Sequence, residues 1–78
     1  MRKILSKNDS LIIFEKAVSY IDSKFPDFAK KLVPENGGDA SVYVYTKGDK
    51  EIRVINDCFI DINKIESNFD FEIPDFKE

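Results

Sequence analysis

The side chains that most often perform chemistry in proteins are scarce in this chain. Histidine is absent, which removes the commonest general base, the usual catalytic triad and the commonest zinc ligand. Cys58 therefore has no imidazole to activate it, and Asp57 beside it works against a stable thiolate. We interpret Cys58 as a core or half-buried residue rather than as a nucleophile.

Paired carboxylates occur, but their spacing suits neither acid–base catalysis nor a metal ion. On a strand, Asp57 and Asp61 would share one face about 13 Å apart, which is too far to share a proton. Asp61, Asn63 and Glu72 match three ligand positions of a calcium-binding loop, yet the position that requires glycine holds glutamate. The sequence therefore predicts no enzyme activity, no metal site and no cofactor.

The length and composition of the chain predict one small globular unit. It has 78 residues, of which 42% are hydrophobic and seven are phenylalanine, so we predict a single domain over residues 1–78. The lone cysteine cannot form an intramolecular disulfide, and the longest apolar run, residues 11–14, is too short for a membrane span. We therefore expect a cytoplasmic protein. Abundant lysine and isoleucine suggest an AT-rich source, such as a low-GC host, its phage or a mobile element.

Two helices are expected near the start of the chain. Ser6 resembles the first residue of a capping box, and apolar residues then recur at steps of three and four, which predicts a helix over residues 7–24. Pro26 suits the first turn of a second helix, predicted over residues 26–32, and Pro34 would end it. The apolar stripe of the long helix comprises Leu11, Phe14, Val18, Ile21 and Phe25.

Strand-forming residues dominate the second half. Residues 41–46 and 51–56 flank a turn, which predicts a hairpin. Further strands are predicted over residues 58–62 and 69–73, the latter from strict alternation of apolar and acidic side chains, with residues 74–78 as a frayed tail. The expected fold class is α+β, with one long and one short N-terminal helix packed on one face of a small antiparallel sheet of three or four strands.

The alternation of residues along the strands also assigns the faces of the sheet. The residues expected to face the helices are Val42, Val44, Ile52, Val54, Ile60 and Ile62. Tyr43, Tyr45 and Arg53 would then lie on the outer face. Residues 2–5 are a candidate for an additional strand, and Asn63 is a candidate cap for one helical turn around Ile65.

Charge is distributed unevenly along the chain. Residues 1–56 carry ten basic and eight acidic side chains, a net of +2, whereas residues 57–78 carry two basic and seven acidic ones, a net of −5. The two segments account for the formal net charge of −3. A split of this kind can steer a protein towards a basic partner.

These features predict a small acidic, non-catalytic protein-binding module. We expect an inhibitor, or an immunity or anti-defence type of protein, that occludes a basic, nucleic-acid-handling surface of a larger partner. Carboxylates of the acidic segment would supply charge, and aromatic side chains would supply apolar anchors. The residues expected to contact the partner are Tyr43, Tyr45, Arg53, Asp57, Asp61, Glu66, Asp70, Glu72, Asp75 and Phe76.

Two alternatives stay open at this point. The first is a nucleic-acid-binding domain that uses the basic and aromatic face of the hairpin, although the acidic total disfavours contact with phosphates. The second is a self-associating structural subunit, a homodimer formed through the edge strand 69–73. No membrane partner is expected.

Overall fold

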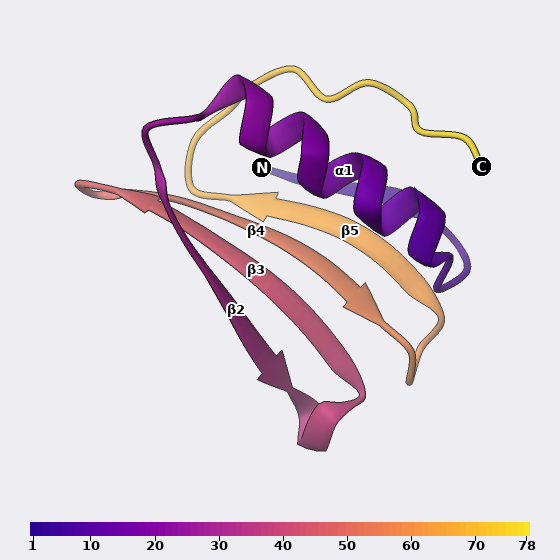
Figure 1. Ribbon diagram of the computed structural model, residues 1–78. Helices are drawn as coiled ribbons and strands as arrows, with labels where there is room; N and C mark the ends of the chain where they lie inside the picture. Colours follow the sequence, from indigo (N-terminus) through magenta and orange to yellow (C-terminus); the bar gives the residue numbers. More distant parts are fainter.

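The computed structural model has one helix and a five-stranded antiparallel sheet (Figure 1). It describes the backbone of residues 1–78 and every side chain except that of Asn36. The elements are β1 (Arg2–Ser6), α1 (Leu11–Lys24), β2 (Ala29–Glu35), a 3-10 turn η1 (Asn36–Gly38), β3 (Ala40–Lys47), β4 (Lys50–Asp57) and β5 (Ile62–Ser67). The strand order is β1-β5-β4-β3-β2. The α+β class is confirmed, but the expected two helices and three or four strands are wrong.

Helix α1 begins four residues later than predicted. Ser10, not Ser6, is the capping residue, and its hydroxyl accepts a hydrogen bond from Ile13 N at 3.3 Å. The Ser6 hydroxyl instead donates to Asn8 O within the preceding loop. The helix lies on one face of the sheet (Figure 1) and buries Ile13, Phe14, Ala17 and Ile21. It is too short and too polar to cross a membrane, and it is the only α-helix among the described residues.

The predicted second helix at residues 26–32 is wrong, because residues 29–35 form β2. This strand pairs along its whole length with β3, from Ala29 opposite Thr46 to Glu35 opposite Ala40. Pro34 is compatible with β2 because the strand lies at an edge of the sheet, where a missing N–H costs no ladder hydrogen bond. Pairing with β3 thus outweighs the local helical signal that Pro26 and Pro34 suggested.

The hairpin is present as β3 and β4, but its tyrosines face the helix. Tyr43 stands opposite Val54 and Tyr45 opposite Ile52, so all four side chains share the face that α1 covers. The inward position expected for Val42 and Val44 and the outward position expected for Tyr43 and Tyr45 are therefore wrong. Ile52 and Val54 face α1 as predicted. The Tyr45 hydroxyl explains why this face is chosen, since it donates to Asp22 Oδ1 on α1 at 2.8 Å and is therefore hydrogen-bonded beneath the helix.

The last strand and the residues after it also differ from the predictions. β5 covers residues 62–67, so the predicted strand 58–62 is wrong: residues 58–61 form a turn and Ile62 begins β5. The predicted helical turn around Ile65 is part of the sheet. Residues 68–78, called the tail from here on, belong to no strand, and the predicted edge strand 69–73 is wrong. Phe69 and Phe71 instead pack their rings against Phe25 at the end of α1.

Candidate protein-binding surface

Three loops meet at one end of the sheet. They follow β1, connect β2 to β3 and connect β4 to β5, and all lie towards the end where α1 begins (Figure 1). We call residues 7–10, 36–39 and 57–61 together the loop end. Antiparallel pairing of all five strands places these loops side by side, although they are up to 50 residues apart in sequence.

Two buried asparagines fasten these loops to the sheet. Asn56 and Asn63 stand opposite each other on β4 and β5, and Asn56 Nδ2 donates to Asn63 Oδ1 at 2.9 Å and to Asp9 O at 3.0 Å. Asn63 Nδ2 donates to Ser6 Oγ at 3.1 Å and to Ser10 O at 2.9 Å. Side-chain amides thus satisfy the backbone of the loop before α1, which has no strand partner of its own.

The β4–β5 turn is fixed by a carboxylate. Asp57 Oδ1 accepts hydrogen bonds from Phe59 N at 2.9 Å and Ile60 N at 3.3 Å, and Cys58 N donates to Asp39 O at 2.8 Å. Asp57, Asn56 and Asn63 are the three buried polar or charged residues among those that the structure describes. The buried polar groups of the molecule therefore concentrate where they hold loops in place.

This fixed turn presents two large apolar side chains to solvent. Phe59 is 76% exposed and Ile60 is 53% exposed. Leu11 and Ile12, which directly follow the first loop of this end, are also exposed, so four of the seven exposed large hydrophobic residues lie at this end. A cluster of exposed apolar groups on rigid loops is typical of an interaction site. Sequence reasoning missed Phe59 and Ile60 because it assigned them to a half-buried strand.

Negative charge also gathers at the loop end. Its charged side chains are one lysine and four aspartates, a net of −3, which equals the formal net charge of the whole chain. The acidic residues are Asp9, Asp39, Asp57 and Asp61. The tail carries the same net charge of −3 and the rest of the chain +3, so the loop end is one of two acidic segments that would attract a basic partner.

The thiol of Cys58 lies close to negatively charged side chains, which affect its pKa. Its sulfur lies 3.5 Å from Asn56 Oδ1 although the residue is exposed. Loss of hydration, then a hydrogen bond to Asp9 and the charges of Asp9, Asp57 and Asp39, raise the pKa of the thiol above its ordinary 9.0. The thiol is therefore a poor nucleophile near neutral pH.

We expect Asp9→Asn to make Cys58 react severalfold faster with a disulfide reagent at pH 8, because removing the nearest negative charge lowers the thiol pKa and increases the thiolate fraction. The rate of release of the chromophore measures the effect. Asp70→Asn, in the tail, is the matched control and should leave the rate unchanged. Equal rates for both variants and the parent chain would contradict the arrangement of Asp9 beside the thiol.

The predicted aromatic anchors are covered. Tyr45 is buried beneath α1, and Tyr43 is half-buried with its ring stacked on Phe14 at 5.8 Å between centroids. Phe76 is half-buried against Tyr20. None of the three is presented to a partner as fully as Phe59 is.

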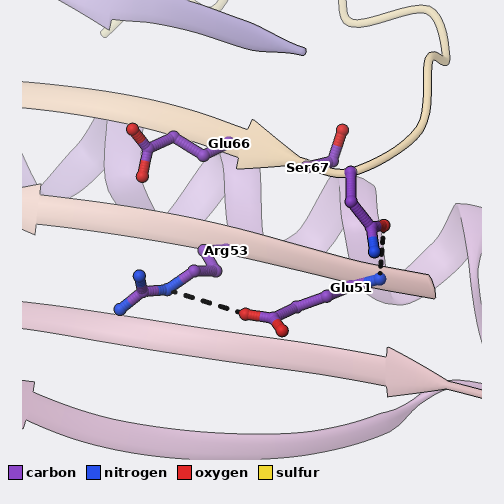
Figure 2. Close-up of a pocket in the computed structure, with 5 residues that line it drawn as sticks. Glu51, Arg53, Glu66 and Ser67 are labelled. Carbon is purple, nitrogen blue, oxygen red and sulfur yellow. Dashed lines mark hydrogen bonds and ion pairs between the residues drawn. The ribbon is translucent and has the colours of Figure 1, made fainter. Parts of the chain in front are cut away.

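Arg53 lies in a shallow hollow on the outer face of the sheet, where glutamates surround it. Figure 2 shows Glu51 and Glu66 beside it, and the hollow has a volume of about 230 Å³. Arg53 NH2 pairs with Glu35, and Arg53 Nε lies 4.0 Å from Glu51 Oε1. The guanidinium is thus neutralised by its neighbours, and the hollow offers neither an anion site nor a nucleophile with a base.

The predicted acidic residues divide into three groups. Asp57 and Asp61 belong to the loop end, Glu66 lies on the outer sheet face beside Lys64, and the rest lie on the tail. The tail residues are Asp70, Glu72 and Asp75, all exposed. Asp75 is paired with Lys3 at 3.0 Å, so β1 offsets one of the tail's negative charges. The predicted set therefore does not form one continuous surface.

No family model, curated protein or solved structure matches this chain. Among the described residues, no group of three or more potential metal ligands comes together. The candidate site is thus defined by its own geometry: the exposed Phe59 and Ile60, the surrounding aspartates and the asparagines that hold the loops.

Proposed function

We propose that this protein is a small acidic, non-catalytic binding module that docks its loop end on a basic surface of a larger protein. The observation that carries the proposal is the exposed Phe59–Ile60 pair on a turn fixed by Asp57 and surrounded by aspartates. Two further observations support a non-catalytic role. Histidine, the commonest general base, is absent, and the pKa of the Cys58 thiol is raised, which makes it a poor nucleophile.

The physical argument combines apolar burial with electrostatic steering. A fully buried phenylalanine side chain contributes roughly 1.5–3 kcal/mol, and a pre-ordered turn loses little conformational entropy when it docks. The aspartates would add complementarity to lysine and arginine around the pocket that receives Phe59. Affinity would then depend mainly on the apolar pair, and the association rate mainly on the aspartates.

The partner class follows from the charge. Extended basic surfaces on proteins commonly bind nucleic-acid phosphates, so a nuclease or another nucleic-acid-handling protein is the expected partner. An inhibitor of the immunity or anti-defence type would act by covering that surface. The alternative of direct nucleic-acid binding by the hairpin has less support, because Tyr45 is buried and Tyr43 is stacked on Phe14.

The test is a quantitative pull-down of the tagged chain from lysate of the source cell or infected host, followed by mass spectrometry at low and moderate salt. Phe59→Ala should weaken capture of the partner about 30-fold or more, as expected for an anchor worth at least 2 kcal/mol. Leu32→Ala, an equally simple truncation of an exposed residue on β2, should leave capture unchanged.

Charge reversal distinguishes the loop end from the tail as the docking surface. Asp39→Lys at the loop end should reduce capture and its sensitivity to salt, whereas Asp70→Lys on the tail should not. Both residues are exposed, so neither change disturbs the core. Capture that survives Phe59→Ala and Asp39→Lys, or that depends equally on Asp70, would rule out the loop end as the docking surface.

A further inference from the structure

The tail is attached to the rest of the chain in two different ways along its length. Its first part is fixed: Asn68 Oδ1 accepts a hydrogen bond from the backbone of β4 at 2.8 Å, and the rings of Phe69 and Phe71 pack against Phe25. Its second part, residues 72–78, forms no strand and runs along α1 towards the first turn of the helix (Figure 1). We call residues 72–78 the strap.

Side chains, rather than a ladder of backbone hydrogen bonds, hold the strap. Among residues 72–78, all of which the structure describes, only Ile73 is buried. The Tyr20 hydroxyl donates to a strap carbonyl at 2.7 Å, and Lys3 Nζ donates to Ile73 O at 2.8 Å. Lys16 Nζ donates to another strap carbonyl, and Lys3 also pairs with a strap carboxylate at 3.0 Å. The strap is therefore held by one buried side chain and a few polar contacts.

The end of the strap fills only part of the groove in which it lies. Phe76 is half-buried, with its ring edge-on to the ring of Tyr20 at 5.8 Å between centroids. Beside it remains a hollow of about 480 Å³, lined by Ile12, Glu15, Lys16, Ser19 and Phe76. Side chains that border an open space lack contact atoms on that side and gain less dispersion energy than side chains in a filled core. The strap is thus packed more loosely on α1 than the sheet is.

Detachment of the strap would leave the other contacts of the fold in place. The four strand pairings involve only residues 2–67, and α1 packs mainly on β4. Of the buried core cluster, only Ile73 would be lost, because the other buried members lie on α1, β3, β4 and β5. A segment with few buried apolar contacts opens at a lower free energy than the whole domain.

We propose that residues 72–78 open and close over α1 and β1 while the helix and the sheet stay folded. The hinge lies after Phe71, whose ring stays packed on Phe25. Opening releases the ammonium groups of Lys3 and Lys16 from the strap and uncovers the apolar site that the strap's isoleucine fills. The open form therefore presents two lysines beside an apolar groove, a surface that the closed form covers.

Thiol labelling measures the opening. Cys58→Ser removes the only cysteine of the sequence. In that background, Ile73→Cys places a thiol at the buried position of the strap, and Val42→Cys places one in the sheet, on the face away from α1, where Val42 has no exposed surface. Each rate of reaction with a disulfide reagent is divided by the rate of the same variant unfolded in urea. The strap thiol should react at least tenfold faster than the sheet thiol, and at least tenfold slower than in urea.

Two added substitutions distinguish opening of the strap from unfolding of the whole chain. Tyr20→Phe removes the hydroxyl that donates to the strap and should make the strap thiol react severalfold faster. Val42→Ala leaves a cavity on the face of the sheet away from α1, which lowers the stability of the whole fold. It should leave the rate of the strap thiol unchanged, because the sheet stays folded when the strap opens.

Three outcomes would overturn the proposal. A strap thiol that reacts as slowly as the sheet thiol, or that reacts faster after Val42→Ala, would mean that residues 72–78 open only when the chain unfolds. A strap thiol that reacts as fast as in urea, or ignores Tyr20→Phe, would mean that the strap is not held closed. Circular dichroism checks that each variant is folded; if Ile73→Cys unfolds, Phe76→Cys, at a half-buried strap position, takes its place. Opening of the strap does not rest on the proposed loop-end function.

Discussion

Replacing Ile65 by alanine should lower the free energy of unfolding by about 3–4 kcal/mol, the usual cost of truncating a fully buried isoleucine. Ile65 has no exposed surface and stands between Val54 and Lys3 on the face beneath α1. The surrounding side chains come from four different elements and cannot all move inward to fill the space left. Urea denaturation, followed by circular dichroism, measures the change.

The matched control for Ile65 is Ile60, which lies five residues earlier and is 53% exposed. Ile60→Ala should change the free energy of unfolding by less than about 0.5 kcal/mol. The two variants also distinguish the observed fold from the one predicted from the sequence. That prediction placed Ile60 inward on a strand and Ile65 in a helical turn. A larger loss for Ile60→Ala than for Ile65→Ala would contradict the position of β5 in the sheet.

Asn63→Ala should lower the free energy of unfolding by about 3 kcal/mol, the largest effect expected of a polar substitution. The change removes a hydrogen-bond partner from buried groups on two elements. Asn56 Nδ2 would lose one of its two acceptors, and Ser10 O one of its two donors, at the start of α1. Because the same amide holds the loop before α1, hydrogen exchange of the backbone amides in residues 7–10 should also accelerate.

Asn68→Ala provides the control for the loss of an asparagine amide. Asn68 also bonds to two backbone groups, Glu51 N and Asp49 O, but it is exposed, so water can replace both contacts. The free energy of unfolding should fall by about 1 kcal/mol or less. If the two alanine variants lost equal stability, the buried amide pair would not be what holds the loop end together.

The parts of the fold that the sequence predicted are those set by local contacts. The helix was predicted from its apolar period, and the hairpin from strand formers on both sides of a turn, and both are present with shifted ends. β2 was missed because its residues are mostly exposed and so show no apolar alternation. It is a strand only because it pairs with β3. The tail was taken for a strand because alternation cannot distinguish a sheet neighbour from a helix neighbour.

The candidate site was predicted only in part, for similar reasons. The acidic segment includes Asp57 and Asp61 of the loop end, but Asp9 and Asp39 join them only through the antiparallel sheet. Tyr43 and Tyr45 were placed on the wrong face because valine and tyrosine suit either side of a strand. Phe59 was missed as an anchor, since a hydrophobic residue is normally expected to be buried.

The strand order has a consequence for folding during synthesis. β1 is made before every other strand, yet it pairs only with β5, which is made last. The β2–β3–β4 meander can form as soon as residue 57 has left the ribosome, because its contacts are local. β1 must wait until residue 67 appears, because β5 is its strand partner, and Asn63 then secures the loop between β1 and α1. A nascent chain that pauses between these points leaves β1 and one edge of β4 without a strand partner, and it is the form in which a chaperone would meet this protein.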